Sequence, residues 1–153
     1  MKPTKVLMVC LGNICRSPLA EGILKSKITN PKIIVDSAGT GAYHIGNLPD
    51  ARSIQIANKY GIDITNQKAR KIKISDLEEF DLIYTMDRAN YQNVIALTTN
   101  TNHRAKVLMI MDELLPLENI SVPDPYYGGD AGFEQVYAML DKACDKIINK
   151  LNM

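Results

Sequence analysis

Four short apolar runs of β type alternate with stretches of helical periodicity, and this alternation limits the possible folds more than any other feature of the chain. The runs cover residues 5–10, 32–36, 81–86 and 106–110. Such alternation predicts an α/β fold with an open, mainly parallel four-stranded sheet and helices on both faces. Ligands bind outside the carboxyl ends of the strands in sheets of this kind, and Cys10 lies at the end of the first run.

The intervening segments carry helix signals of different strength. Ser17 followed by Pro18 is typical of a helix N-cap and first helical position. Residues 49–60 and 88–97 are further helix candidates, and apolar residues at steps of three and four predict one long helix over residues 133–151. The chain has 153 residues with no repeat and no linker, so we expect a single domain over residues 1–153.

Composition excludes several classes of function. The formal net charge is +1 and the basic residues are spread out, so a nucleic-acid partner is not expected. No apolar run approaches the ~20 residues of a membrane span and no leader pattern is visible, which predicts a cytoplasmic protein with no membrane partner. The few cysteines and histidines lack metal-ligand spacing, so neither a metal nor another cofactor is expected.

The most informative segment is residues 9–18, Val-Cys-Leu-Gly-Asn-Ile-Cys-Arg-Ser-Pro, where a predicted strand ends and a predicted helix begins. Backbone N–H groups at a helix N-terminus lack helical partners, and together with the helix dipole they can bind an anion. Gly12 and Asn13 are residue types that tolerate left-handed backbone, which helps to direct successive N–H groups into one concavity. The segment therefore predicts a phosphate-binding loop.

Two residues give this loop a possible chemistry. Arg16, six positions after Cys10, has a planar fork that matches two phosphate oxygens. Cysteines at helix N-termini or beside cations have pKa values of roughly 3.5–7.5, so Cys10 is expected to act as a thiolate nucleophile without a histidine base. Ser17 can donate a hydrogen bond to that sulfur or simply cap the helix. A nucleotide-binding P-loop is excluded, because Cys-Arg-Ser stands where that motif needs Gly-Lys-Ser/Thr.

Residues 10–18 resemble the signature loop of the low-molecular-weight protein tyrosine phosphatases. The resemblance extends over nearly the whole chain, with Asp-Ser-Ala-Gly-Thr at 36–40, Met-Asp at 86–87 and Asp-Pro-Tyr-Tyr-Gly at 124–128 matching further segments of that family. It implies hydrolysis of phosphotyrosine proteins or peptides through a phosphocysteine intermediate, with inorganic phosphate as the product.

The resemblance also assigns roles to residues. Asp124, between Pro123 and Pro125, would be the general acid and base. Further residues are expected to bind substrate or phosphate, either as part of the loop and its rim or as tyrosines that flank the substrate ring. They are Leu11, Gly12, Asn13, Ile14, Cys15, Ser17, Tyr43, Tyr126 and Tyr127.

Several residues are expected to support the loop. Ser37 resembles the hydrogen-bond partner of Asn13 in the family, and Asp87 resembles a carboxylate that orients groups near the site, although it can equally cap a helix. Many members have a histidine in the segment corresponding to residues 66–72. None is present here, so we expect Gln67 or Lys68 to replace it, or the network to be smaller.

The remaining cysteines and the residue at position 14 bear on alternative functions of this fold. Family resemblance suggests that Cys15 forms a reversible disulfide with Cys10, although it can also be a packing residue. An arsenate reductase on the same fold would need a relay of two more cysteines, whereas Cys144 lies on the apolar face of the last helix. A protein-arginine phosphatase would have threonine in place of Ile14, and an inactive phosphotyrosine-binding module would be expected to lack the nucleophile or the acid. We expect a monomer or a weak homodimer.

Overall fold

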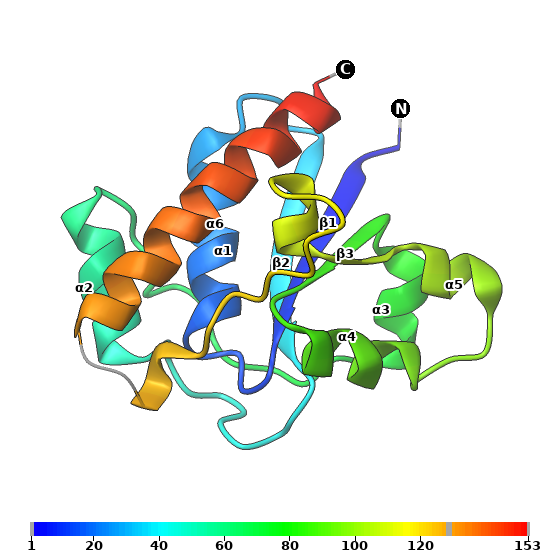
Figure 1. The fold of residues 1–153 in the computed structure, drawn as a ribbon, viewed down its shortest axis with the longest axis horizontal. Coiled ribbons are helices and arrows are strands. Elements are labelled where there is room, and N and C mark those ends of the chain that lie inside the picture. The colour runs from blue at the N-terminus through cyan, green and yellow to red at the C-terminus, as the bar shows by residue number, and fades with distance from the viewer. Residues whose placement is uncertain (1, 128–129, 153) are drawn as a thin grey trace.

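The computed structural model describes residues 2–127 and 130–152 (Figure 1). The strands are β1 (Thr4–Cys10), β2 (Ile33–Gly39), β3 (Leu82–Thr85) and β4 (Val107–Met109). The α-helices are α1 (Arg16–Lys27), α2 (Ala51–Lys59), α3 (Ile74–Glu79), α4 (Arg88–Ile95), α5 (Thr101–Ala105) and α6 (Asp130–Leu151), and two 3-10 turns are η1 (Ile110–Glu113) and η2 (Pro125–Tyr127).

The four strands form one sheet in the order β2-β1-β3-β4, and every pair of neighbours is parallel. The expected α/β fold with a four-stranded parallel sheet is therefore confirmed. Because β1 is central, its carboxyl end lies beside those of β2 and β3, and Cys10 is in register with Gly39 of β2. Residues 11–15 join the end of β1 to the start of α1, so this loop lies at the same edge of the sheet.

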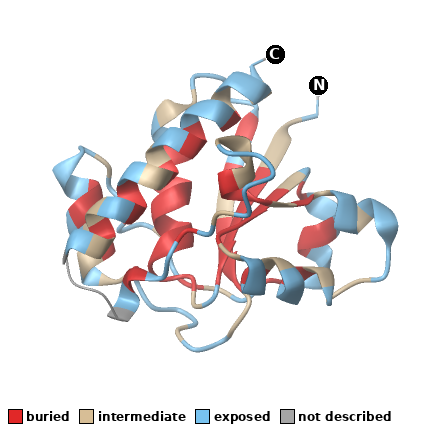
Figure 2. Cartoon of the chain, viewed as in Figure 1, coloured by how far each residue is buried: buried red, intermediate tan, exposed pale blue. Residues whose placement is uncertain are grey.

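Helices cover both faces of the sheet, with α1, α2 and α6 on one side and α3 and α4 on the other (Figure 1). Side chains of β1 alternate between the two resulting cores, as the two-residue period of a strand requires. Val6 and Met8 belong to the core under α1 and α6, whereas Leu7 and Val9 belong to the core under α3 and α4. All four are fully buried, as are Ile83, Tyr84 and Thr85 of the neighbouring strand β3 (Figure 2).

Helix boundaries differ from expectation mainly at α1. The helix begins at Arg16 with Cys15 as its N-cap residue, and no side chain caps it. The prediction that Ser17 is the N-cap is therefore wrong, because its hydroxyl bonds to Cys10 and Asn13 instead. The predicted helices at 49–60, 88–97 and 133–151 correspond to α2, α4 and α6. The helices α3 and α5 were not predicted, since six and five residues are too few to establish a period.

No helix in the described ranges 2–127 and 130–152 has the length and apolar character needed to cross a membrane.

Candidate active site

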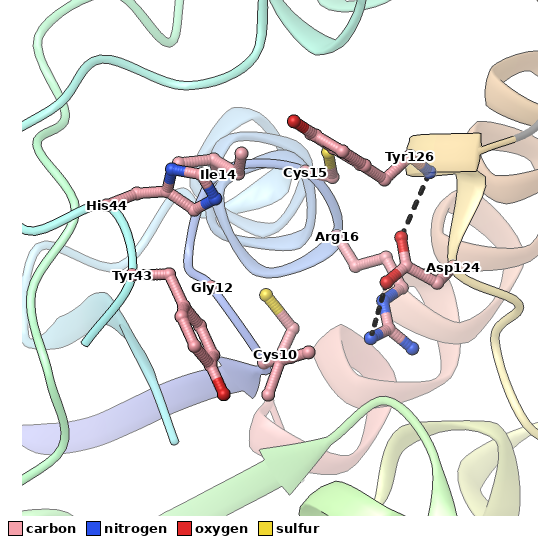
Figure 3. A pocket seen from close by; sticks show the side chains of 10 residues that line it. Cys10, Gly12, Ile14, Cys15, Arg16, Tyr43, His44, Asp124 and Tyr126 are labelled. Atoms are coloured by element: carbon pink, nitrogen blue, oxygen red, sulfur yellow. Dashed lines mark hydrogen bonds and ion pairs between the residues drawn. The ribbon is translucent and has the colours of Figure 1, made fainter. Parts of the chain in front are cut away.

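A cavity of about 460 Å³ opens at the carboxyl end of β1, over the N-terminus of α1 (Figure 3). Most of the residues expected at the site line it, and His44 joins them. The lining residues are Cys10, Leu11, Gly12, Ile14, Cys15, Arg16, Tyr43, His44, Asp124 and Tyr126. Residues from three separate parts of the chain thus meet around the sulfur of Cys10.

The phosphate loop, residues 10–17, is bent sharply by one left-handed residue. Asn13 has a φ of 57°, whereas Gly12 keeps an ordinary negative φ, so of the two candidates only Asn13 adopts the left-handed conformation. Gly39 of β2 lies so close to the loop that a Cβ there would be 2.7 Å from the carbonyl oxygen of Leu11. Only glycine fits at this position, a requirement that no local sequence pattern indicates.

Asn13 is the centre of a buried hydrogen-bond network that holds the loop. Its Nδ2 amide donates to the hydroxyl oxygens of Ser17 at 2.7 Å and Ser37 at 3.0 Å, and its Oδ1 accepts the backbone N–H of Arg70 at 3.0 Å. Ser37 in turn donates its hydroxyl to Oε1 of Glu21 at 2.6 Å. The network fixes Asn13 in its left-handed conformation and joins the loop to β2 and α1.

The network also leaves Ser17 able to donate a hydrogen bond to the nucleophile. Ser17 Oγ lies 3.0 Å from Cys10 Sγ, a separation at which either atom can donate. Because Ser17 Oγ already accepts a hydrogen bond from Asn13, its own hydrogen is available for the sulfur. The predicted role of Ser17 as a donor to Cys10 is therefore consistent with this geometry.

Neither Gln67 nor Lys68 replaces the family histidine in this network. The Gln67 Nε2 amide donates to the carbonyl oxygen of Pro18 at 3.0 Å, so it contacts α1 and not the loop side chains. Glu21 and the backbone of Arg70 complete the network in its place, and neither role was predicted from the sequence. Glu21 is 3% exposed and pairs with Lys25 at 2.5 Å. In the sequence, the one indication of this role is that Glu21 follows Ser17 by four residues and so lies on the same side of α1.

Arg16 is buried against the loop that carries the candidate acid. Its Nη1 donates to Oδ2 of Asp87 at 2.6 Å and to the carbonyl oxygen of Val122 at 2.9 Å, and its Nη2 lies 3.7 Å from Oδ2 of Asp124. Asp87 also accepts the N–H of Asn90 at 2.8 Å as the N-cap of α4. Asp87 therefore has both of the roles considered for it: it orients Arg16, and it caps α4.

Asp124 and two tyrosines form the more open wall of the cavity. One oxygen of Asp124 accepts the backbone N–H of Tyr126 at 3.0 Å, which orients the carboxylate beside Arg16 (Figure 3). Tyr43 and Tyr126 lie on opposite sides of Cys10 in the same view, and the ring of His44 is 6.3 Å from that of Tyr126. The side chain of Tyr127 lies outside the described part of the structure.

The other two cysteines differ in their relation to the cavity. Cys15 lines it, and burial together with the charge of Asp50 raises the pKa of Cys15 to about 12, so this residue is a thiol at neutral pH. Cys144 is fully buried on α6 beside Ala20 of α1, and it does not line the cavity that holds Cys10. Among residues 2–127 and 130–152, no cluster of His, Cys, Asp and Glu could hold a metal ion.

Comparison with known proteins places this arrangement in a family. A family model described as "Low molecular weight phosphotyrosine protein phosphatase" matches residues 5–153. The Low molecular weight phosphotyrosine protein phosphatase of Schizosaccharomyces pombe is 41% identical over 144 residues, 91% of each chain. The chain belongs to the low molecular weight phosphotyrosine protein phosphatase family.

Solved structures agree with this membership of the phosphatase family. A protein tyrosine phosphatase from Entamoeba histolytica matches with a TM-score of 0.91 and 38% identity, over 97% of both chains. Vibrio vulnificus Wzb, in complex with benzylphosphonate, matches with a TM-score of 0.86 and 27% identity, over 96% of this chain and 98% of that one. The family and fold expected from the sequence are confirmed.

Proposed function

We propose that this chain is a protein tyrosine phosphatase that hydrolyses phosphotyrosine through a phosphocysteine intermediate. The gathering of Cys10, Arg16 and Asp124 around one cavity is the observation that supports it most directly. Membership of the phosphatase family supports the same reaction, and so does the aromatic phosphonate bound to Vibrio vulnificus Wzb.

In the first step, the thiolate of Cys10 attacks phosphorus and the bond from phosphorus to the phenolic oxygen breaks. Arg16 and the backbone N–H groups of residues 11–16 hold the phosphoryl oxygens, where charge develops in the transition state. Asp124 gives its proton to the departing phenolate, a contribution of about 10²–10⁴-fold for a positioned acid. Tyrosine leaves as a neutral phenol, and phosphate remains on the sulfur.

In the second step, water attacks the phosphocysteine and the bond between sulfur and phosphorus breaks. The carboxylate of Asp124 takes a proton from the water, which restores the acid for the next cycle. The hydroxyl of Ser17, 3.0 Å from the sulfur, stabilises the departing thiolate. Inorganic phosphate is the product.

The rim supports an aromatic substrate. Tyr43 and Tyr126 would flank the ring of phosphotyrosine, since aromatic pairs contribute about 0.5–1.5 kcal/mol beyond burial. Leu11 and Ile14 add apolar surface on the cavity wall. A role for Tyr127 and a reversible disulfide between Cys10 and Cys15 stay predictions, as do the single domain, the cytoplasmic location and the monomer or weak homodimer.

Steady-state hydrolysis of phosphotyrosine and phosphoarginine peptides tests this function. Wild type should prefer phosphotyrosine, and Cys10→Ser should lose turnover because a hydroxyl replaces the thiolate. Cys144→Ala is a matched control that removes a thiol from the core without touching the cavity, and it should keep its turnover. Activity in Cys10→Ser would contradict the mechanism, and faster cleavage of phosphoarginine would contradict the substrate class.

The role of Asp124 is tested with leaving groups of different basicity. Asp124→Ala should lower kcat/KM for phenyl phosphate by about 10²–10⁴-fold. The loss should be much smaller for p-nitrophenyl phosphate, whose leaving group departs without protonation. An equal loss for both substrates would argue against Asp124 as the acid.

A further inference from the structure

The acid loop, residues 122–126, is attached to the protein on both sides of Asp124. On one side, the N–H of buried Val122 donates to the carbonyl oxygen of Met86 at 2.8 Å, and its own carbonyl oxygen accepts from Arg16. On the other side, the carbonyl oxygen of Tyr126 accepts Nη2 of Arg52 at 2.9 Å. Asp124 lies between these two attachments, and its side chain is 38% exposed.

Arg52 is held in a fixed orientation by groups on three sides. Its Nε and Nη2 donate to the two carboxylate oxygens of Asp50 at 3.1 and 3.2 Å, in a bidentate pair. Its guanidinium also packs over the ring of Phe133, 4.7 Å from the centroid, and over that of Tyr126, 5.6 Å away. The contacts with α6 and with the acid loop leave this side chain little freedom to move.

Asp50 connects this arginine to the phosphate loop. It is the N-cap of α2, where its side chain accepts the N–H of Arg52 at 2.8 Å. Its own N–H donates to the carbonyl oxygen of Ile14 at 2.8 Å. A continuous path therefore runs from Ile14 through Asp50 and Arg52 to the backbone of Tyr126, and so joins the loop that holds phosphate to the loop that holds the acid.

The path ends on the carboxylate itself. The carbonyl oxygen of Tyr126 is held by Arg52, and the N–H of Tyr126 donates to Oδ1 of Asp124. An acid must lie within hydrogen-bond reach of the leaving oxygen, and a misplacement of about 1 Å can lower a rate by 10²-fold. We propose that Arg52 is a positioning residue that holds Asp124 over Cys10, an inference that rests on the proposed phosphatase function.

Substitution of Arg52 should act most on substrates that need the acid. Arg52→Ala is expected to lower kcat/KM for phenyl phosphate by about 10–100-fold, and for p-nitrophenyl phosphate by less than about threefold, since misplacement removes part of the acid contribution. Arg52→Lys should give an intermediate loss for phenyl phosphate, because an ammonium can donate to the Tyr126 carbonyl but cannot form the bidentate pair. Equal losses for the two substrates in Arg52→Ala would overturn the proposal.

Lys59→Ala supplies the matched control. Lys59 lies on the same helix as Arg52 and pairs with Glu134 of α6, so its loss weakens the contact between the two helices without reaching the acid loop. Lys59→Ala should keep the kcat/KM values of wild type for both substrates. A loss selective for phenyl phosphate in Lys59→Ala would show that general loosening of α2 accounts for the effect, and would overturn the proposal.

A double-mutant cycle tests whether Arg52 acts through Asp124. In an Asp124→Ala background, Arg52→Ala should cause no further loss specific to phenyl phosphate, because the acid that it positions is already gone. A second selective loss, equal to that in the wild-type background, would mean that Arg52 acts by another route.

Hydrogen exchange separates failure of the proposal from failure of the proposed function. Arg52→Ala should speed exchange of the Tyr126 amide relative to wild type and to Lys59→Ala, because the hydrogen bond to Asp124 is less well held. If wild type hydrolysed no aryl phosphate, the proposed phosphatase function would be contradicted. Exchange of the Tyr126 amide would still test whether Arg52 holds the acid loop in place. Unchanged exchange at Tyr126 would overturn the proposal.

Discussion

The phosphate loop and the aromatic rim lie on the same cavity, but they are built in opposite ways. Asn13, Arg16 and Ser17 of the loop are each at most 2% exposed, and each makes buried hydrogen bonds. Tyr43 of the rim is 73% exposed, and Tyr126 is 38% exposed. A site whose interior is rigid and whose edge is open can perform one reaction on many phosphorylated substrates, while the edge selects among them.

The acid loop is intermediate in exposure between the phosphate loop and the rim. It is anchored at Val122 in the core and at Tyr126 near the surface, with Asp124 exposed between them. The contrast between the buried phosphate loop and the exposed rim predicts two kinds of effect. Substitutions in the phosphate loop should lower activity toward every substrate alike, whereas substitutions in the rim should change which substrates are preferred.

Among substitutions that compare the supporting residues of the phosphate loop with the rim, the largest effect is expected at Arg16. Arg16→Ala should lower kcat/KM by about 10²–10³-fold or more, the range for loss of one donor to a charged transition state. The loss should be similar for p-nitrophenyl phosphate and for phosphotyrosine peptides, and Arg16→Lys should recover little because a point charge lacks the planar fork. Near-normal activity toward either substrate would contradict the assignment of Arg16 as the phosphate clamp.

A smaller loss is expected at Ser17. Ser17→Ala removes a hydrogen bond to a charged sulfur, for which about 1.5–3 kcal/mol corresponds to a 10–150-fold decrease in kcat. Ser26→Ala is a suitable control on the same helix, because Ser26 donates to the carbonyl oxygen of Ile23 and does not touch the loop. If the two variants had equal kcat values, Ser17 would have no role in stabilising the thiolate.

A rim substitution should change selectivity instead of chemistry. Tyr43→Ala should lower kcat/KM for aryl phosphates by about 2–12-fold, the equivalent of 0.5–1.5 kcal/mol for a ring contact. Hydrolysis of an alkyl phosphate such as glycerol phosphate should not change, and Tyr43→Phe should behave as wild type with both substrates. An equal loss for aryl and alkyl phosphates would place Tyr43 in the chemistry and remove the contrast between loop and rim.

The smallest expected effect concerns stability and pH at Asp50, which joins the two regions. Burial tends to raise the pKa of Asp50, but hydrogen bonds and charge from Arg52 outweigh it, so the pKa lies below its ordinary value in the folded protein. A carboxyl with a lowered folded pKa stabilises the protein above its ordinary pKa of about 3.9, and this contribution is lost as pH falls further.

Urea unfolding of wild type and Asp50→Asn at pH values from 7 to 3 measures this contribution. Wild type should be the more stable of the two near neutral pH, and the difference in unfolding free energy should shrink as pH falls below about 5. A difference that stayed constant over this range would show that the charge of Asp50 does not contribute.

The sheet and the phosphate loop could be predicted because both are recorded in local patterns, whereas the role of Asp124 as the acid was expected from the family resemblance and stays a prediction. Apolar runs mark the strands, and the residues from Cys10 to Pro18 carry the loop within one segment. Glu21, Arg70 and Arg52 were missed because their roles depend on partners at least 16 residues away in sequence, namely Ser37, Asn13 and Tyr126. Such contacts exist only once the crossovers place those segments side by side.

The N-cap at Ser17 was wrong for a related reason. A Ser-Pro pair is a good local signal for a helix start, yet the hydroxyl of Ser17 has better partners in Cys10 and Asn13 than the first turn of α1 offers. Tertiary hydrogen bonds therefore decide where a capping side chain points when an active site lies at the helix end.

The most direct test of the central claim is to trap the covalent intermediate. The Asp124→Ala variant should accumulate phosphocysteine from p-nitrophenyl phosphate, because formation does not need the acid for this leaving group whereas hydrolysis needs the base. After an acid quench, mass spectrometry should find phosphate on the peptide that contains Cys10. Release of p-nitrophenol with no phosphate on Cys10, or with phosphate on another residue, would contradict this mechanism.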